Sequence, residues 1–162
     1  MKGTLVKRAD KLAFYGVPGE GEGTVTYYRM KGFTEISISK NSKEYTRQYV
    51  DEAFEETDVT GYSPSVSYAF DMYKEQTPQS DIVKITDDEL TGDDAIREII
   101  FVDLTSKDSD GKYLAKKRSF AVIPDSEGGS TDAYTYSGSF KAKGPSEDVT
   151  VTISENTLTI SE

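Results

Sequence analysis

The sequence predicts a mainly β protein, an antiparallel β-sandwich or barrel with one flanking α-helix at about residues 79–90. Three observations predict this fold class. Apolar and polar residues alternate with a period of two along several segments, which is typical of half-buried strands. Turn residues separate these segments, and only one segment has helical spacing. At 162 residues the chain fits one domain, and we expect a single domain over 1–162.

The clearest alternation lies in residues 65–73, with Val66, Tyr68, Phe70 and Met72 on one face. The other face carries Ser65, Ser67, Ala69, Asp71 and Tyr73. Upstream, residues 33–40 and 43–50 also alternate, and Asn41-Ser42 between them has turn composition. We therefore predict a β-hairpin over 33–50.

The second half of the chain predicts two more hairpins and a single strand. Segments 96–104 and 112–123 flank an Asp110-Gly111 turn, and segments 148–154 and 156–161 flank Glu155-Asn156. Residues 133–143 form a long strand interrupted by glycine. The helix at 79–90 follows Pro78 and carries Asp81 near its start, as helix openings often do.

Two segments are not predicted as strands. The glycine-rich stretch 16–23 is interpreted as a connector, so we expect a flexible N-terminal segment of about 1–23. Residues 51–65 hold five carboxylates, a glycine and a proline and are interpreted as a long acidic loop. Loops of this length in a compact domain are usually functional or disordered.

The composition argues against an enzyme. The chain has no His and no Cys, which removes the commonest general base, the Ser-His-Asp triad, thiolate nucleophiles and most transition-metal sites. The acidic run Asp87, Asp88, Glu89, Asp93 and Asp94 is better explained as a solvated helix end than as a cation site. We expect no catalytic, metal or cofactor-binding residue, and no cofactor.

Net charge and hydropathy indicate self-association instead. Only about a fifth of the residues are Leu, Ile, Val or Phe, so the core is thin. Residues 1–48 carry a net charge of +4 and residues 49–110 a net charge of −13. This asymmetry suits a molecule whose basic region meets the acidic region of the next copy, although a solvated surface explains it equally well. The overall charge of −10 opposes specific DNA binding, and no apolar run approaches a membrane span.

Three stretches together resemble the major tail proteins, or tail tube proteins, of long-tailed phages and prophage-derived tail-like particles. They are YVDEAFEETDVTGYSPSVSYAFDMY (49–73), DIVKITDDELTGDDAIREIIFVDL (81–104) and KKRSFAVIPDSEGGSTDAYTYSGSFKAKG (116–144). The resemblance implies a structural virion protein without catalytic residues, folded as a β-sandwich with one helix. Six copies would close a ring, and stacked rings would form the conduit for DNA ejection. Expected partners are copies of itself, the tape measure, the tail terminator and the baseplate or tip, in a virion tail assembled in the bacterial cytoplasm.

These considerations yield two sets of candidate site residues. An inter-ring contact is expected between the acidic segment and the basic N-terminal residues Lys7 and Arg8; the acidic set is Asp51, Glu52, Phe54, Glu55, Glu56, Asp58 and Tyr62. The channel lumen is expected on the face with Ser65, Ser67 and Asp71, past which DNA would move without specific binding. The alternative is a β-sandwich binding module that recognises a glycan or a host surface. The lack of Trp, the usual platform for sugars, weighs against it.

Overall fold

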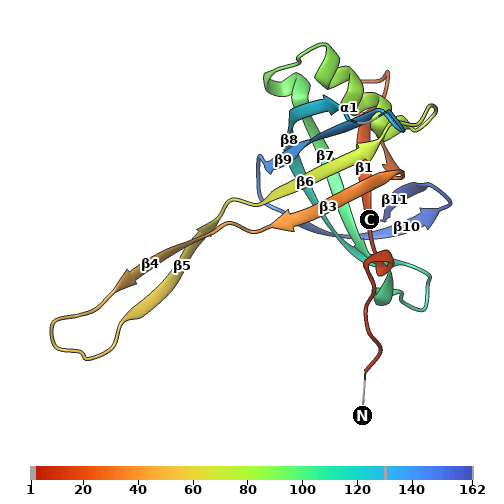
Figure 1. Cartoon of the computed structure of the whole chain (residues 1–162). Coiled ribbons are helices and arrows are strands. Elements are labelled where there is room, and N and C mark those ends of the chain that lie inside the picture. The colour runs from red at the N-terminus through yellow and green to blue at the C-terminus, as the bar shows by residue number, and fades with distance from the viewer. Residues whose placement is uncertain (1–2, 130, 162) are drawn as a thin grey trace.

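The computed structural model describes residues 3–129 and 131–161, and it is mainly β with one α-helix (Figure 1). The first six strands are β1 (Lys11–Pro18), β2 (Val25–Arg29), β3 (Phe33–Ser39), β4 (Ser42–Arg47), β5 (Glu56–Tyr62) and β6 (Ser65–Asp71). The helix α1 (Thr77–Asp87) follows, and then β7 (Ile96–Asp103), β8 (Tyr113–Gly128), β9 (Thr135–Ala142), β10 (Glu147–Ser154) and β11 (Thr157–Ser161). Short 3-10 turns are η1 (Arg8–Asp10), η2 (Gly92–Ala95) and η3 (Leu104–Ser106). The predicted fold class is confirmed.

Nine strands form one antiparallel sheet in the order β10-β11-β2-β1-β7-β8-β9-β6-β3. Strand β8 also pairs with β10, so the first six strands in this order close into a small barrel. Its interior is filled by a cluster that includes Phe14, Ile100 and Val151, each at 0% exposure. Closure gives each of these six strands a neighbour on both sides, although β11 and β2 pair only at Thr157–Tyr28 and Leu158–Tyr27.

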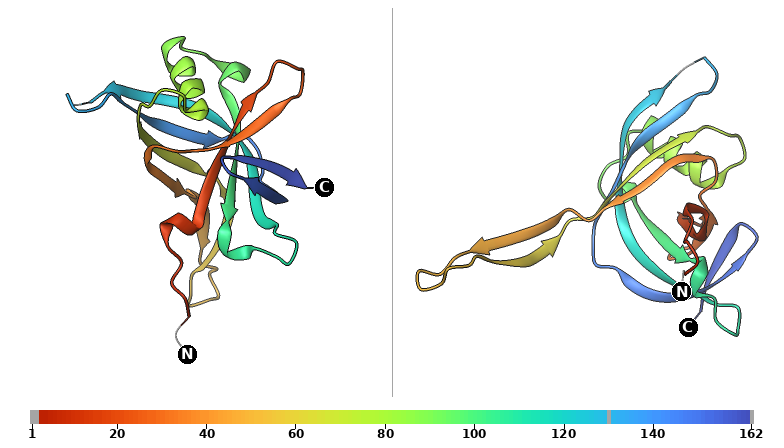
Figure 2. Two further views of the ribbon diagram at one scale, coloured as in Figure 1. Left: turned by 90° about the vertical axis from the view of Figure 1, so that its right-hand side faces the viewer. Right: turned by 60° about the horizontal axis from the view of Figure 1, so that its bottom comes forward.

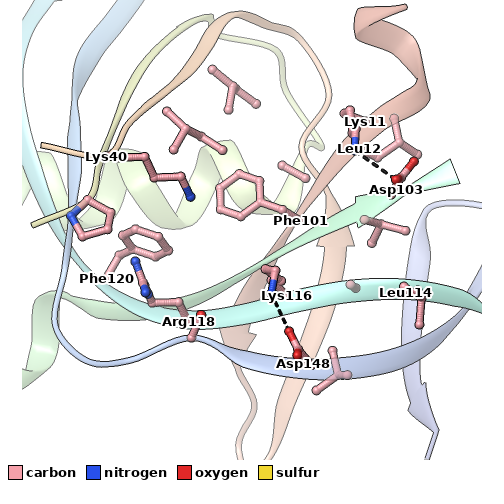
Figure 3. A pocket seen from close by; sticks show the side chains of 18 of the residues that line it. Lys11, Leu12, Lys40, Phe101, Asp103, Leu114, Lys116, Arg118, Phe120 and Asp148 are labelled. Carbon is pink, nitrogen blue, oxygen red and sulfur yellow. Dashed lines mark hydrogen bonds and ion pairs between the residues drawn. The ribbon is translucent and has the colours of Figure 1, made fainter. Parts of the chain in front are cut away.

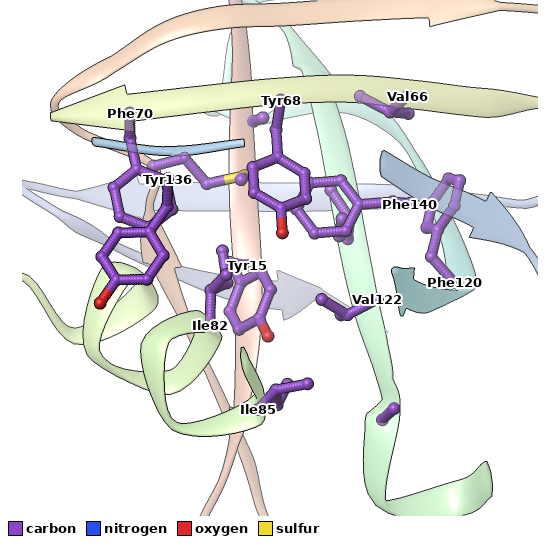
Figure 4. Packing of buried hydrophobic residues seen from close by; sticks show 14 residues of the cluster. Tyr15, Val66, Tyr68, Phe70, Ile82, Ile85, Phe120, Val122, Tyr136 and Phe140 are labelled. Atoms are coloured by element: carbon purple, nitrogen blue, oxygen red, sulfur yellow. The ribbon is translucent and has the colours of Figure 1, made fainter. Parts of the chain in front are cut away.

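Strand β8 joins this barrel to a second layer. Its first half pairs with β7 and β10, and its second half pairs with β9. Strands β8, β9, β6 and β3 thus form a four-stranded layer whose inner face packs on β1, β7 and α1. Stacked rings dominate this second core: the Tyr68 and Phe140 centroids lie 4.4 Å apart, and those of Phe70 and Tyr136 lie 5.4 Å apart (Figure 4).

The helix is confirmed with bounds shifted toward the N-terminus. It begins at Thr77, with Pro78 in the first turn, where a missing N–H costs nothing. Asp88 caps it, and Glu89 takes a left-handed φ of 51° that ends the helical path. Ile82 and Ile85 on this helix are buried against the second core. No helix in residues 3–129 and 131–161 is long and apolar enough to cross a membrane.

The predicted hairpin over 33–50 is wrong. Strand β3 pairs with β6, from Phe33–Phe70 to Ser39–Ser65, and β4 pairs with β5. At Lys40-Asn41 the chain continues outward and does not reverse, because Asn41 forms hydrogen bonds with Ser63 and Ser65 on the returning strand. Two long antiparallel runs therefore form one ribbon, and its outer part projects well beyond the body (Figures 1 and 2). We call residues 42–62 the arm.

Two other expectations need correction. The acidic loop over 51–65 is half strand, because Glu56–Tyr62 is β5, and only residues 48–55 form the arm tip. The N-terminal segment of 1–23 is not flexible throughout: Lys11–Pro18 is the central strand β1, with Phe14 and Tyr15 fully buried. Its apolar run fits a strand buried on both faces. Residues 1–2 lie outside the described part. Strand β2 had no counterpart among the predicted elements.

The remaining predicted strands are confirmed. Strands β7 and β8 form the expected hairpin around Asp110-Gly111, where Gly111 has a φ of 77°. Strands β10 and β11 form the terminal hairpin, and Glu155 in its turn has a φ of 55°. Strand β9 lies within the predicted 133–143 segment and carries Gly138 opposite Tyr68.

Candidate functional site: the assembly surfaces

The arm has no hydrophobic core and is reinforced by one cationic side chain. The guanidinium of Arg47 donates hydrogen bonds to the carboxylates of Asp58 (2.5 Å) and Glu56 (3.2 Å) on the partner strand. The Cζ atom of Arg47 lies 5.2 Å from the ring centroid of Tyr45 and 5.8 Å from that of Tyr49. These contacts link β4 to β5 and to the start of the tip, and so they hold the two strands of the projecting ribbon together.

The surface of the arm combines apolar and acidic side chains. Val50 and Phe54 at the tip are 108% and 81% exposed, and Tyr45, Tyr49, Val59 and Tyr62 are also exposed. Such a concentration of exposed apolar side chains is typical of a protein interaction surface. Of the predicted contact residues, Asp51, Glu52, Phe54 and Glu55 lie at the tip, and Glu56, Asp58 and Tyr62 lie on β5.

The predicted basic partners of the arm lie elsewhere. Lys7 precedes the 3-10 turn η1, and the guanidinium of Arg8 in that turn donates hydrogen bonds to the carbonyls of Lys11 (2.6 Å) and Ile36 (3.2 Å). The tip and η1 are far apart in Figure 1 and in the right-hand view of Figure 2. A single copy therefore does not bring the acidic and basic sets together.

The outward face of the four-stranded layer is rich in hydroxyl groups. Ser65 lies opposite Lys141, Ser67 opposite Ser139, and Asp71 opposite Thr135 on β9. On the other side β3 places Ser39 opposite Ser65 and Ser37 opposite Ser67. The structure thus brings the predicted lumen residues Ser65, Ser67 and Asp71 onto one face, whose only charged neighbours in these registers are Glu35 and Lys141.

The same layer has two free strand edges within the described residues. Strand β3 pairs only with β6. At the other side, the pairing of β8 with β7 stops at Ala121, so the stretch 122–128 pairs only with β9. Pro124 lies in this stretch, and proline is tolerated at sheet edges because it has no N–H to donate. Each edge offers unpaired backbone groups to another chain.

A groove of about 750 Å³ lies beside the β3 edge, between β3 and the barrel strands (Figure 3). Its apolar lining includes Ile36, Ile38, Phe101, Leu114 and Phe120. Lys11 and Lys116 on its rim form ion pairs with Asp103 (3.0 Å) and Asp148 (2.6 Å). In the described part of the chain, the lining cations Arg8, Lys40 and Arg118 form no ion pair. Sequence reasoning missed the groove because its residues come from five separate strands and from the segments beside them.

Residues 3–129 and 131–161 contain no group of three His, Cys, Asp or Glu side chains that could hold a metal ion. The acidic side chains of Asp87, Asp88, Glu89, Asp93 and Asp94 are all exposed. Hydrogen bonds from Thr105, together with Lys11, lower the pKa of Asp103 to about 2, which keeps this carboxylate ionised on the groove rim.

Comparisons with known proteins agree on the fold. A chain from the tail of an empty gene transfer agent particle, with C6 symmetry, matches with a TM-score of 0.61 at 16% identity, over 88% of this chain and 98% of that chain. A chain of the native gene transfer agent virion matches with a TM-score of 0.60 at 14% identity, over 89% and 98%. The SPP1 tail tube matches with a TM-score of 0.55 at 13% identity, over 89% and 78%. No protein-family model and no curated protein sequence matches the chain.

This likeness shows the fold: the chain is folded like these tail and tail tube chains, as the sequence resemblance predicted. The match to the gene transfer agent tail chains covers nearly their whole length.

Proposed function

We propose that this chain is a structural subunit of a tail tube, in which six copies close a ring and stacked rings form a conduit for DNA. The observation that carries the proposal is the four-stranded layer with two free edges, β3 and residues 122–128 of β8. It is supported by the shared fold with chains of phage and gene transfer agent tails.

The layer has an even number of strands, and this favours continuation into a ring. Strands β8, β9, β6 and β3 alternate in direction, so the β3 edge of one copy runs opposite to the β8 edge. Rotation about a ring axis keeps strand directions, and the two edges would therefore meet as an antiparallel pair. Repetition of this unlike-edge contact would produce a continuous barrel around a channel.

The hydroxyl-rich face would then line the channel. Ser65, Ser67 and Asp71 lie on the side of the layer opposite the buried Val66 and Tyr68. Hydroxyls keep the wall hydrated and carboxylates repel phosphates, so DNA would pass without specific binding. The arm would extend from each ring to the next. In this role the chain catalyses no reaction and works in the tail of a virion assembled in the host bacterial cytoplasm, together with the tape measure, terminator and baseplate or tip proteins.

Sedimentation velocity over a wide concentration range, combined with negative-stain electron microscopy of concentrated protein, tests this function. We expect rings or tubes with a central channel. A two-fold dimer at every concentration and salt level would contradict the proposal, because a closed two-fold contact cannot continue as a ring. A monodisperse monomer that binds glycans would replace it with the binding-module alternative.

A further inference from the structure

We propose that the arm tip of one copy docks into the groove beside β3 of another copy. This inference rests on the proposed tube function and adds to it a specific pair of surfaces. The two surfaces are the tip, residues 48–55, and the groove between β3 and the barrel strands.

The charges of the two surfaces are complementary. The tip carries the exposed carboxylates of Asp51, Glu52 and Glu55 and no basic residue. The groove has three cations that form no ion pair in the described part of the chain, Arg8, Lys40 and Arg118. The Nε of Arg118 is buried without a hydrogen-bond partner among the described residues, so this guanidinium is incompletely paired within one copy.

The apolar surfaces are complementary as well. The tip exposes Val50 and Phe54 almost completely. The groove exposes Leu114 (64%) and Ile38 (48%) above a floor of aromatic side chains. An exposed aromatic side chain that enters an apolar cleft is the usual anchor of a protein interface, and a charged rim then fixes its orientation.

The occupant must come from a second copy. Lys40 and Pro64, at the base of the arm, line the groove of the same chain, and the tip lies at the far end of the projecting ribbon. The paired strands β4 and β5 hold the ribbon extended, so a chain cannot fold its own tip back into its own groove. A tip-in-groove contact joins unlike surfaces and leaves one of each unused, and so it propagates along an assembly.

Cross-linking tests this contact directly, because the chain has no cysteine of its own. Full-length Val50→Cys protein is mixed with full-length Leu114→Cys or Ile38→Cys protein and treated with a short bis-maleimide. We expect heterodimers joining tip and groove positions. Tyr134→Cys protein is added to the same reaction, because the exposed connection between β8 and β9 is the other segment of the chain that could occupy the groove.

Charge reversal provides the matched variants. Lys40→Glu in the groove should reduce the yield of tip–groove product about tenfold, whereas Lys107→Glu, exposed outside the groove, should leave the yield unchanged. Tubes that form without tip–groove cross-links, or with Tyr134→Cys cross-links in their place, would overturn the docking proposal and leave the tube function standing. Tip–groove cross-links without rings or tubes would support docking and overturn the tube. The absence of both would overturn both.

Discussion

The phenol of Tyr15 donates a 2.5 Å hydrogen bond to the carboxylate of Asp81, and this bond joins the central strand β1 to the helix α1. The guanidinium of Arg97 on β7 donates to the same carboxylate at 2.8 Å. The charged side chains of Asp81 and Arg97 are each only 11% exposed. Three elements distant in sequence therefore meet at one carboxylate, which fixes the helix against the sheet.

Removal of this carboxylate should be costly. Asp81→Ala leaves the guanidinium of Arg97 largely buried without its ionic partner, and we expect the free energy of unfolding to fall by about 3 kcal/mol. Urea unfolding followed by circular dichroism measures the change. Asp87→Ala, exposed on the same helix, should change it by less than about 0.5 kcal/mol. Equal effects of the two substitutions would contradict the role of Asp81.

Gly138 is required by close packing inside the four-stranded layer. A Cβ at this position would lie 2.5 Å from the carbonyl oxygen of Ile123 and 2.7 Å from Oη of Tyr68. We expect Gly138→Ala to lower the free energy of unfolding by about 2 kcal/mol, because the backbone of β8 must shift. Gly61→Ala on the arm, where no atom lies within 4 Å, is the matched control and should be nearly neutral. An unchanged stability in Gly138→Ala would refute the packing argument.

Buried tyrosines predict a loss of stability at alkaline pH. Burial, together with the carboxylates of Asp87 and Glu127, raises the pKa of Tyr136 to about 12, and burial also raises the pKa of Tyr15 and Tyr68. In the unfolded chain a tyrosine ionises at about pH 10. The contribution of these neutral tyrosines to stability is thus fully present below about pH 10 and is lost as the pH rises toward 12. Urea unfolding over this range measures the decline, which Tyr136→Phe should reduce. A constant free energy of unfolding through this range would contradict the prediction.

The sequence predicts which face of a strand is buried better than it predicts which strands pair. The alternation at Val66, Tyr68 and Phe70 correctly indicates one buried face, because side-chain direction depends only on the local backbone. The same pattern does not indicate which strand lies alongside: the sequence predicts that β3 pairs with β4, whereas β3 pairs with β6. Strand β1 escaped prediction because a strand buried on both faces shows no alternation.

Of the candidate surfaces, the hydroxyl-rich face could be predicted from the sequence and the groove could not. The Ser65, Ser67 and Asp71 face follows from periodicity and is a real surface of the layer. The groove depends on residues from β1, β3, β7, β8 and β10 that only the folded chain brings together. One local signal was available: Leu114 is an apolar residue at an outward position of a strand, with Lys112 and Lys116 on either side.

The arm should be dispensable for folding and necessary for tubes. Replacement of residues 44–60 by Asn-Gly joins Lys43 to Gly61, which already lie opposite each other, through a two-residue turn. The body keeps both hydrophobic clusters, so we expect its free energy of unfolding to change by less than about 1 kcal/mol. Electron microscopy should show no tubes. Tubes of normal length from the shortened chain would contradict the role of the arm.

The charge of the hydroxyl-rich face should control the passage of DNA. Double-stranded DNA presents about one phosphate charge per 1.7 Å, and each cation that neutralises a phosphate adds affinity through counterion release. In the proposed ring, Asp71→Lys would add one cation per subunit to the lumen and remove one carboxylate. Because the side chain of Asp71 points away from the buried cores, we expect tubes to form as before and to retain double-stranded DNA at low salt. Release should follow as the salt concentration rises, since salt screens these contacts.

Asp88→Lys, at the exposed end of α1, makes the same charge change away from this face and should retain no DNA. Cosedimentation of DNA with tubes at increasing salt measures the difference. Equal retention by the two variants would show that the Asp71 face does not line the channel.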